Sequence, residues 1–153
     1  MRENIDAIDR ALLNRIQSDF PITSRPFGAI AEELGITEAD VIARLTRLKA
    51  DGFIRRIGGN FVPEKLGYVS TLCAAKVPPD RIDHFADTVN GYPGVTHNYL
   101  RENDYNVWFT FIAPSRTEIA DNLARIAEET GVEDILNLPA THVFKIRAKF
   151  KVK

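Results

Sequence analysis

The sequence predicts an α+β protein in which a helical domain precedes a domain of alternating strands and helices. Two observations lead to this prediction. Apolar residues recur at helical spacing through the first third of the 153-residue chain. Further on, runs rich in β-branched and aromatic residues alternate with helical segments in the order β-α-β-β-α-β. We therefore expect residues 1–62 to form a winged helix-turn-helix domain and residues 63–153 a second domain.

Three helices and a wing are predicted in the first domain. The apolar spacing predicts a first helix over about residues 4–18. A second helix is expected to begin at Pro26 and to end at Gly35, and a third to begin with a capping box at Thr37. Short strands within residues 53–62, around a Gly-Gly-Asn turn, predict the wing.

The second domain is predicted to be ferredoxin-like, with an antiparallel sheet and both helices on one face. Because so apolar a sheet is rarely left bare, its other face is expected to contact a second subunit or a ligand. The expected elements are a strand over 68–77, a helix over 80–90, a hairpin over 95–112, a helix over 116–130 and a last strand over 141–152.

Composition favours a cytoplasmic protein without structural zinc. No apolar run approaches the roughly 20 residues of a membrane helix, and the N-terminus lacks the apolar segment of a secretory signal. The single Cys73 lies in an apolar run, where we expect it to pack as a small hydrophobe.

Charge argues against DNA as the ligand of the helix-turn-helix. The net charge is -1, and residues 1–60 carry nine basic and nine acidic side chains. The first turn of the would-be recognition helix contains Glu38 and Asp40, which oppose approach to phosphates. Arg44 and Arg47 suit either backbone contacts or a solvated helix face.

The hairpin is the strongest candidate for a ligand-facing surface. Its polar and aromatic side chains would each need a partner if they only filled a core. Strand alternation places His97, Tyr99 and Arg101 on one face. The candidate residues are His97, Tyr99, Arg101, Tyr105, Asn106 and Trp108.

The predicted last strand alternates apolar with basic residues, so that one face would be uniformly basic. Lysines at its end are equally explained as protection of an edge strand. For Lys145 and Arg147, deeper in the predicted sheet, an anionic ligand is the preferred interpretation.

The whole chain resembles the siroheme decarboxylase subunits of the Lrp/AsnC architecture. The hairpin pattern H-N-Y-L-R-E-N-D-Y-N-V-W-F is the most specific match. In this family the hairpin loop often carries a second His, where this chain has Asn103. The other matching stretches are D-F-P-I-T-S-R-P-F (19–27), G-F-I-R-R-I-G-G-N-F (52–61), K-L-G-Y (65–68), L-P-A (138–140) and F-K-I (144–146).

The resemblance implies that siroheme loses two acetate carboxyl groups as CO₂ to give didecarboxysiroheme. No cofactor is then required for the chemistry, because the iron belongs to the substrate, although haem binding stays open. A homologous second subunit in a heterodimer is implied, with a homodimer as the alternative. A DNA-binding regulator or a tetrapyrrole-binding module without catalysis are the competing functions.

Roles for the candidate residues follow from the chemistry of a flat, polycarboxylated substrate. His97 and Arg101 are the catalytic candidates: His97 as proton donor, with iron ligation or a structural role as alternatives, and Arg101 as a carboxylate partner together with Lys145 and Arg147. Tyr99, Tyr105 and Trp108 are expected as walls or donors, beside Asn106. Two interpretations are open for Arg25, Arg55 and Arg56. In the first, Arg25 orders the turn between the helices and Arg55 or Arg56 pairs with a local carboxylate; in the second, which we favour, all three help to bind the substrate.

Overall fold

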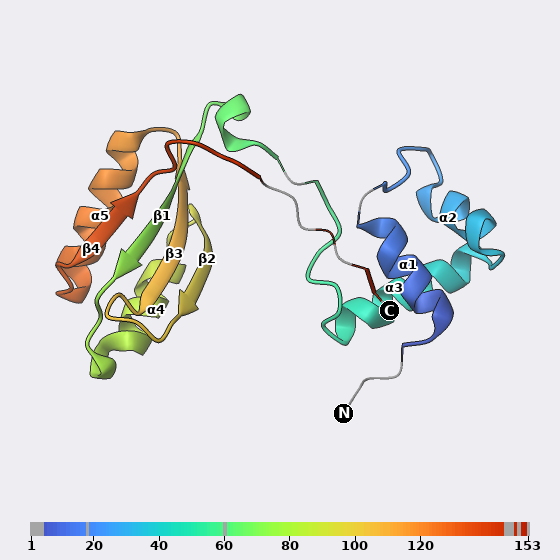
Figure 1. Cartoon of the computed structure of the whole chain (residues 1–153), viewed down its shortest axis with the longest axis horizontal. Coiled ribbons are helices and arrows are strands. Elements are labelled where there is room, and N and C mark those ends of the chain that lie inside the picture. Colours follow the sequence, from blue (N-terminus) through green and yellow to red (C-terminus); the bar gives the residue numbers. More distant parts are fainter. Residues whose placement is uncertain (1–4, 18, 60, 146–148, 150, 153) are drawn as a thin grey trace. The chain divides into compact units, whose positions relative to one another are not determined.

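The computed structural model describes residues 5–17, 19–59, 61–145, 149 and 151–152. The chain forms two compact units, one of residues 1–59 with 145–153 and one of residues 60–144 (Figure 1). The C-terminal residues therefore group with the helical unit, whereas the sequence placed them in the second domain. Two hydrogen bonds explain this grouping, because the side-chain amide of Asn14 donates to Val152 O (3.1 Å) and accepts from Val152 N (3.0 Å).

The helical unit contains α1 (Ala7–Ile16), α2 (Pro26–Leu34) and α3 (Glu38–Ala50), which confirms the three predicted helices. The first is shorter than expected, because Asp6 caps α1 with a reciprocal hydrogen bond to Asp9. Gly35 ends α2 in the left-handed conformation, and Thr37 caps α3 as predicted. The apolar faces meet in a core that includes Leu12, Leu13, Ile30, Val41, Leu45, Leu48 and Ile54.

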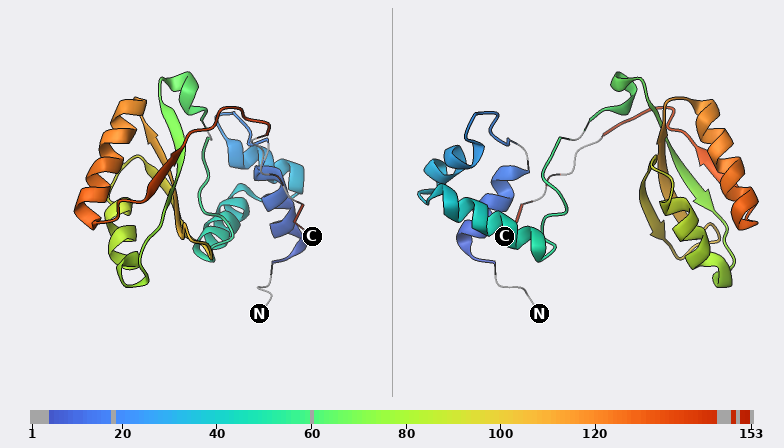
Figure 2. Two further views of the ribbon diagram at one scale, coloured as in Figure 1. Left: turned by 60° about the vertical axis from the view of Figure 1, so that its left-hand side comes forward. Right: turned by 180° about the vertical axis from the view of Figure 1, so that it is seen from behind.

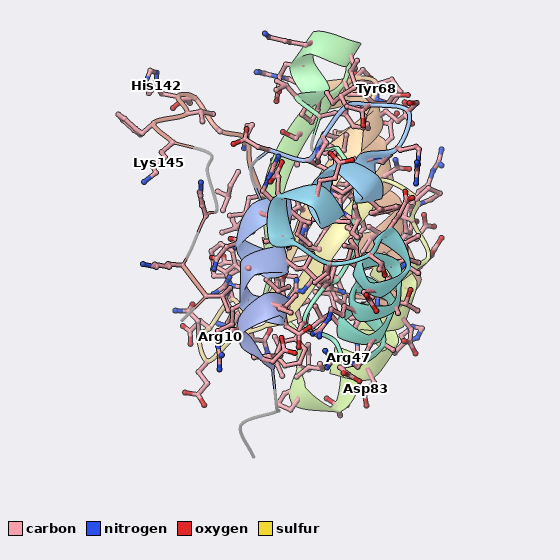
Figure 3. All side chains as sticks on the ribbon, turned by 90° about the vertical axis from the view of Figure 1, so that its right-hand side faces the viewer. Arg10, Arg47, Tyr68, Asp83, His142 and Lys145 are labelled. Carbon is pink, nitrogen blue, oxygen red and sulfur yellow. The ribbon has the colours of Figure 1, made fainter. Side chains whose placement is uncertain are left out.

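A buried carboxylate ties α1 to α3. Asp9 is only 1% exposed and accepts hydrogen bonds from Arg44 (2.8 Å) and Arg47 (2.6 Å); Figure 3 labels Arg47. Burial alone would raise the pKa of Asp9, but the hydrogen bonds from Arg47 and Arg44 outweigh it and hold the pKa below its usual value. Two of the basic side chains that phosphate contacts would need are thus engaged within the protein.

The predicted wing is not observed. Residues 53–59 and 61–62 contain no strand, although the sequence pattern suggested two. Instead, the amides of Phe53 and Ile54 both donate to Leu48 O, at 2.9 and 3.2 Å. These bonds fold the start of the segment back onto the end of α3, so they take the donors that a strand ladder would use.

The second unit has the predicted ferredoxin-like order. Its elements are β1 (Val69–Ala75), α4 (Ile82–Asn90), β2 (Val95–Leu100), β3 (Val107–Ala113), α5 (Arg116–Thr130) and β4 (Ile135–Leu138), with short 3₁₀ turns at Pro63–Leu66 and Pro79–Arg81. The strands form one antiparallel sheet in the order β2-β3-β1-β4. Figure 2 shows that α4 and α5 lie on the same face of this sheet.

Alternate strand residues build the core between the sheet and these helices. On β3, Val107, Phe109, Phe111 and Ala113 are buried, while the residues between them are only half-buried. This alternation is typical of a sheet with one covered face. The helices contribute Phe85, Val89, Ile119, Leu123 and Ile126, and β1 contributes Cys73 and Ala75.

The last strand lies earlier in the chain than predicted. The sequence predicted a strand over residues 141–152, but β4 is Ile135–Leu138, paired with Leu72 to Ala75 of β1. Residues 141–145, 149 and 151–152 are not in a strand, and residues 146–148, 150 and 153 lie outside the described residues. The physical reason is that β4 carries apolar residues and one Asn, whereas a strand over 141–152 would align like charges along one face.

Burial explains the state of Cys73. Its side chain is fully buried in the sheet core, and burial raises the pKa of the thiol to about 12. The residue packs as the small hydrophobe that the sequence predicted. Within the described ranges, no three His, Cys, Asp or Glu side chains gather closely enough to hold a metal ion.

None of the helices in the described part of the chain combines the length and the apolar character needed to cross a membrane.

Candidate functional site

One face of the sheet is not covered by α4 or α5, and the hairpin presents its aromatic residues there. Strand pairing places Tyr99 opposite Trp108 and His97 opposite Thr110, so these residues share a face. The same face carries exposed leucines from the neighbouring strands, at 36–42% relative exposure: Leu72, Leu136 and Leu138. The result is an open surface of aromatic and apolar side chains.

Four hairpin side chains form a continuous row on this surface. The rings of His97 and Tyr99 are stacked, with centroids 6.1 Å apart and planes 26° apart. The guanidinium carbon of Arg101 lies 6.0 Å from the centroid of Tyr99 and 5.8 Å from that of Trp108. A guanidinium within about 6 Å of an aromatic ring is held by cation-π attraction. The row therefore combines an imidazole, two flat rings and a cation. The sequence predicted the shared face of His97, Tyr99 and Arg101, and the pairing of β2 with β3 adds Trp108.

The polar groups of Asn106, Tyr105 and Trp108 hold the hairpin in place. The side-chain amide of Asn106 accepts from Val77 N (2.9 Å) and donates to Val77 O (2.8 Å). The Tyr105 hydroxyl donates to Asp134 (2.8 Å), which raises the pKa of the phenol. Trp108 Nε1 donates to Tyr105 O (2.6 Å). These polar groups have partners within the unit, and substrate contacts by Tyr105 and Asn106 stay a prediction.

The hairpin loop uses Asn103 as a turn residue. Its side-chain oxygen accepts a hydrogen bond from Tyr105 N at 3.2 Å, and its own N–H donates to Arg101 O at 3.1 Å. A side chain that accepts from the backbone two residues on stabilises a tight turn. This role in the turn explains why the chain has an amide side chain at position 103, where the hairpin loop of the subunits that it resembles often carries a second His.

The helical unit contains a separate candidate site around Arg55 and Arg56. Both line an open cavity of about 990 Å³, whose other lining residues are mostly apolar. Arg56 also donates to Gly59 O at 3.1 Å. The cavity unites two of the stretches that carry the resemblance, because 19–27 supplies Phe20 and 52–61 supplies both arginines. A cavity with apolar walls and two cations suits an anion with a large apolar body.

Arg25 has a structural partner. Its guanidinium forms an ion pair with Glu38, the first residue of α3, and the contact raises the pKa of Arg25. The pair spans the turn between α2 and α3, as the structural alternative for Arg25 proposed. Its side chain is nevertheless largely exposed, so substrate binding by Arg25 stays a prediction.

Of the two basic C-terminal candidates, Lys145 is described by the structure and does not lie in the sheet. Lys145 is exposed and projects from an extended segment rather than from a strand, with His142 on the same stretch (Figure 3). Its predicted role was argued from a strand that is absent at this position, so that argument no longer supports it. Arg147 lies outside the described residues.

Two features of these sites were not predicted from the sequence. The first is the set of exposed leucines on the open face, although the alternation of Leu72 with buried Thr71 and Cys73 carries that signal. The second is the cavity that residues 19–27 and 52–61 line together. No local pattern reports a contact between segments so far apart in sequence.

Comparison with known proteins identifies the structural class to which this chain belongs. Residues 65–145 match the model of the AsnC-like ligand binding domain, and residues 9–55 match that of the siroheme decarboxylase NirDL-like HTH domain. The leucine response regulatory protein LrpA of Mycobacterium tuberculosis has the same fold, with a TM-score of 0.80 at 20% identity over 97% of this chain and all of that one. The protein is thus of the Lrp/AsnC-like class.

More similar relatives narrow the class to one family. The siroheme decarboxylase alpha subunit of Desulfovibrio desulfuricans is 54% identical over 149 residues, covering 97% of this chain and 86% of the relative. The chain belongs to the family of siroheme decarboxylase subunits. The crystal structure of the siroheme decarboxylase NirDL, also determined with an iron-uroporphyrin III analogue, gives a TM-score of 0.66 at 34% identity. That match covers 95% of this chain and 48% of NirDL, so this chain spans about half of the NirDL chain.

Proposed function

We propose that this chain is a subunit of a carboxy-lyase that converts siroheme to didecarboxysiroheme, with its reaction centre on the open face of the sheet. The observation that carries the proposal is the row of His97, Tyr99, Arg101 and Trp108. Aromatic rings suit a flat macrocycle, a guanidinium suits its carboxylates, and an imidazole can exchange a proton near neutral pH. A cytoplasmic location is part of the proposal.

Decarboxylation needs only a few protein groups. Each carbon-carbon bond that breaks releases CO₂ and leaves its electron pair on the methylene carbon, where the macrocycle delocalises it. His97 then donates a proton to that carbon to form the methyl group. Solvent returns a proton to the imidazole ring of His97. Arg101 binds a peripheral carboxylate that does not react, which fixes the position of the macrocycle.

We further propose, for the helical unit taken by itself, that Arg55 and Arg56 bind carboxylates of siroheme. Siroheme carries eight carboxylates, more than the guanidinium group of Arg101 alone can neutralise. The cavity beside Arg55 and Arg56 offers apolar walls together with two guanidinium groups. Each good charge-assisted contact contributes roughly 1.5–3 kcal/mol.

A homologous partner is the proposed second component. The exposed leucines of the open face extend beyond the aromatic row, so a second sheet can cover them while the row contacts substrate. Asn103 stabilises the hairpin turn. We therefore expect the partner to supply the second proton donor of the reaction, in addition to His97.

The test is a titration of the purified chain, alone and with its homologous partner, with siroheme under reducing, oxygen-free conditions. Visible absorption follows binding, and mass spectrometry follows the pigment. The proposal predicts loss of two carboxyl groups as CO₂. Binding without CO₂ release by the paired subunits would identify a tetrapyrrole-binding module instead, and sequence-dependent DNA binding that ignores tetrapyrrole would identify a regulator.

A further inference from the structure

Strand β2 contains an irregularity next to His97. Val95 pairs with Phe111 and His97 with Thr110, so two steps along β2 correspond to one step along β3. Thr96 is therefore the extra residue of a β-bulge. Bulges change the direction of side chains and are common beside active sites.

The bulge brings together two side chains that a regular strand would separate. Neighbouring residues of a regular strand point to opposite faces. Here the hydroxyl oxygen of Thr96 lies 3.0 Å from His97 Nδ1, which is hydrogen-bond distance. Among the described residues, Thr96 is the one that makes a hydrogen-bond contact with the His97 ring. The contact occupies Nδ1, one of the two ring nitrogens.

We propose that Thr96 is a positioning residue for His97, which reserves Nε2 for proton exchange with the substrate. This inference rests on the proposed function. A hydroxyl can donate to an unprotonated Nδ1 and accept from a protonated one. When the mobile proton leaves from and returns to Nε2, Nδ1 keeps its own hydrogen and donates it to the Thr96 hydroxyl oxygen, so the contact persists in both charge states of the ring.

Stacking against Tyr99 adds a second constraint on the same ring. The Tyr99 contact sets the plane of the imidazole, and the Thr96 hydroxyl sets its rotation within that plane. A proton donor must lie within hydrogen-bond reach of its target atom, so a ring free to rotate would spend less time in the reactive geometry.

The test replaces the hydroxyl without changing the shape of the side chain. Thr96→Val removes the hydroxyl and keeps a β-branched residue in the bulge, and Thr96→Ser restores the hydroxyl. Thr110→Val removes the hydroxyl opposite His97 in the ladder. Nitrogen-15 NMR of the histidine rings in the full chain reports the state of Nδ1 and Nε2. Signals lost in His97→Ala assign the ring.

We expect the nitrogen shifts of His97 to move in Thr96→Val toward those of the exposed His84, and to stay at wild-type values in Thr96→Ser and Thr110→Val. With siroheme, kcat of Thr96→Val should fall about fivefold at unchanged KM, which corresponds to about 1 kcal/mol. Thr96→Ser should retain the wild-type rate.

Unchanged His97 shifts in Thr96→Val, or shifted values with an unchanged kcat, would overturn the positioning role. Failure of the wild-type chain, paired with its homologous partner, to release CO₂ would contradict the proposed function instead. The NMR comparison is independent of turnover and still reports whether Thr96 holds the ring.

Discussion

Tyr99 and Trp108 face each other across β2 and β3, and the guanidinium of Arg101 lies about equally far from both rings, at 6.0 and 5.8 Å. The two rings thus hold the cation at the end of the row that begins at His97. Because this position does not depend on the substrate, Arg101 is already oriented when the macrocycle arrives.

The first prediction concerns this cation. Arg101→Ala should weaken siroheme binding by roughly ten- to a hundredfold, the equivalent of one charge-assisted contact, and should change kcat little. Absorption titrations and initial rates measure the two effects. Arg125→Ala, on the helix that covers the opposite face of the sheet, is the matched control and should bind as wild type. A large loss of kcat at unchanged affinity would instead place Arg101 in the chemical step.

The second prediction tests the buried carboxylate of the helical unit. Asp9→Asn should lower the stability of that unit by about 1–3 kcal/mol, because two arginines lose their shared partner. Far-UV circular dichroism during urea unfolding measures the loss. Fluorescence of Trp108, the only tryptophan, reports the sheet unit and should be unchanged. Asp6→Asn keeps the helix cap and should cost less than Asp9→Asn.

Acid should have the same effect as Asp9→Asn. The pKa of Asp9 in the folded protein lies below its usual value of 3.8, so the folded state binds this proton more weakly than the unfolded state. The stabilisation is therefore complete above that usual value and is lost as the pH falls through the folded pKa. An Asp9→Asn variant with wild-type stability at neutral pH would contradict this account.

The third prediction concerns the approach to β2. A Cβ atom on Gly94 would lie 2.3 Å from Ile112 O and 2.7 Å from the ring of Phe111, and Ile112 N also donates to Gly94 O (2.8 Å). Gly94→Ala should therefore displace the start of the hairpin and destabilise the sheet unit by about 1–3 kcal/mol. Tryptophan fluorescence during urea unfolding measures this loss of stability. Gly58→Ala, which would meet only the end of the Arg56 side chain, should be neutral.

The fourth prediction concerns nucleic acid. Arg44 and Arg47 are engaged by Asp9, and the first turn of α3 carries Glu38 and Asp40. We expect fluorescence anisotropy with duplex DNA to detect only weak binding that is independent of sequence and disappears at physiological salt. Retention of a preferred sequence at 0.15 M salt would favour the regulator function.

Local sequence signals predicted the helices, the hairpin and the face shared by His97, Tyr99 and Arg101. Capping residues such as Thr37 and the alternation of β3 are encoded within a few residues, so they can be read directly. Periodicity failed for the described part of 141–152, which is residues 141–145, 149 and 151–152. The sequence alternates there, but like charges along one face make strand pairing unfavourable. A strand needs a partner as well as a pattern, and only the pairing with β1 identifies Ile135–Leu138.

Side-chain partners were the least predictable part of the candidate site. Nothing near Asn106 indicates that Val77 takes both ends of its amide, because the two residues are distant in sequence. The bulge at Thr96 likewise depends on the register of β3 against β2, which sequence alone does not specify.

The most direct test of the reaction centre is the pigment mass after incubation of siroheme with the paired subunits, comparing wild type, His97→Ala and His84→Ala. The exposed His84 on α4 is the control and should behave as wild type. We predict that His97→Ala still binds siroheme, as judged by its absorption spectrum, and leaves its mass unchanged, while wild type removes two carboxyl groups. Iron ligation by His97 would instead appear as a shifted Soret band with partial turnover. Didecarboxysiroheme formed by His97→Ala at the wild-type rate would contradict the account.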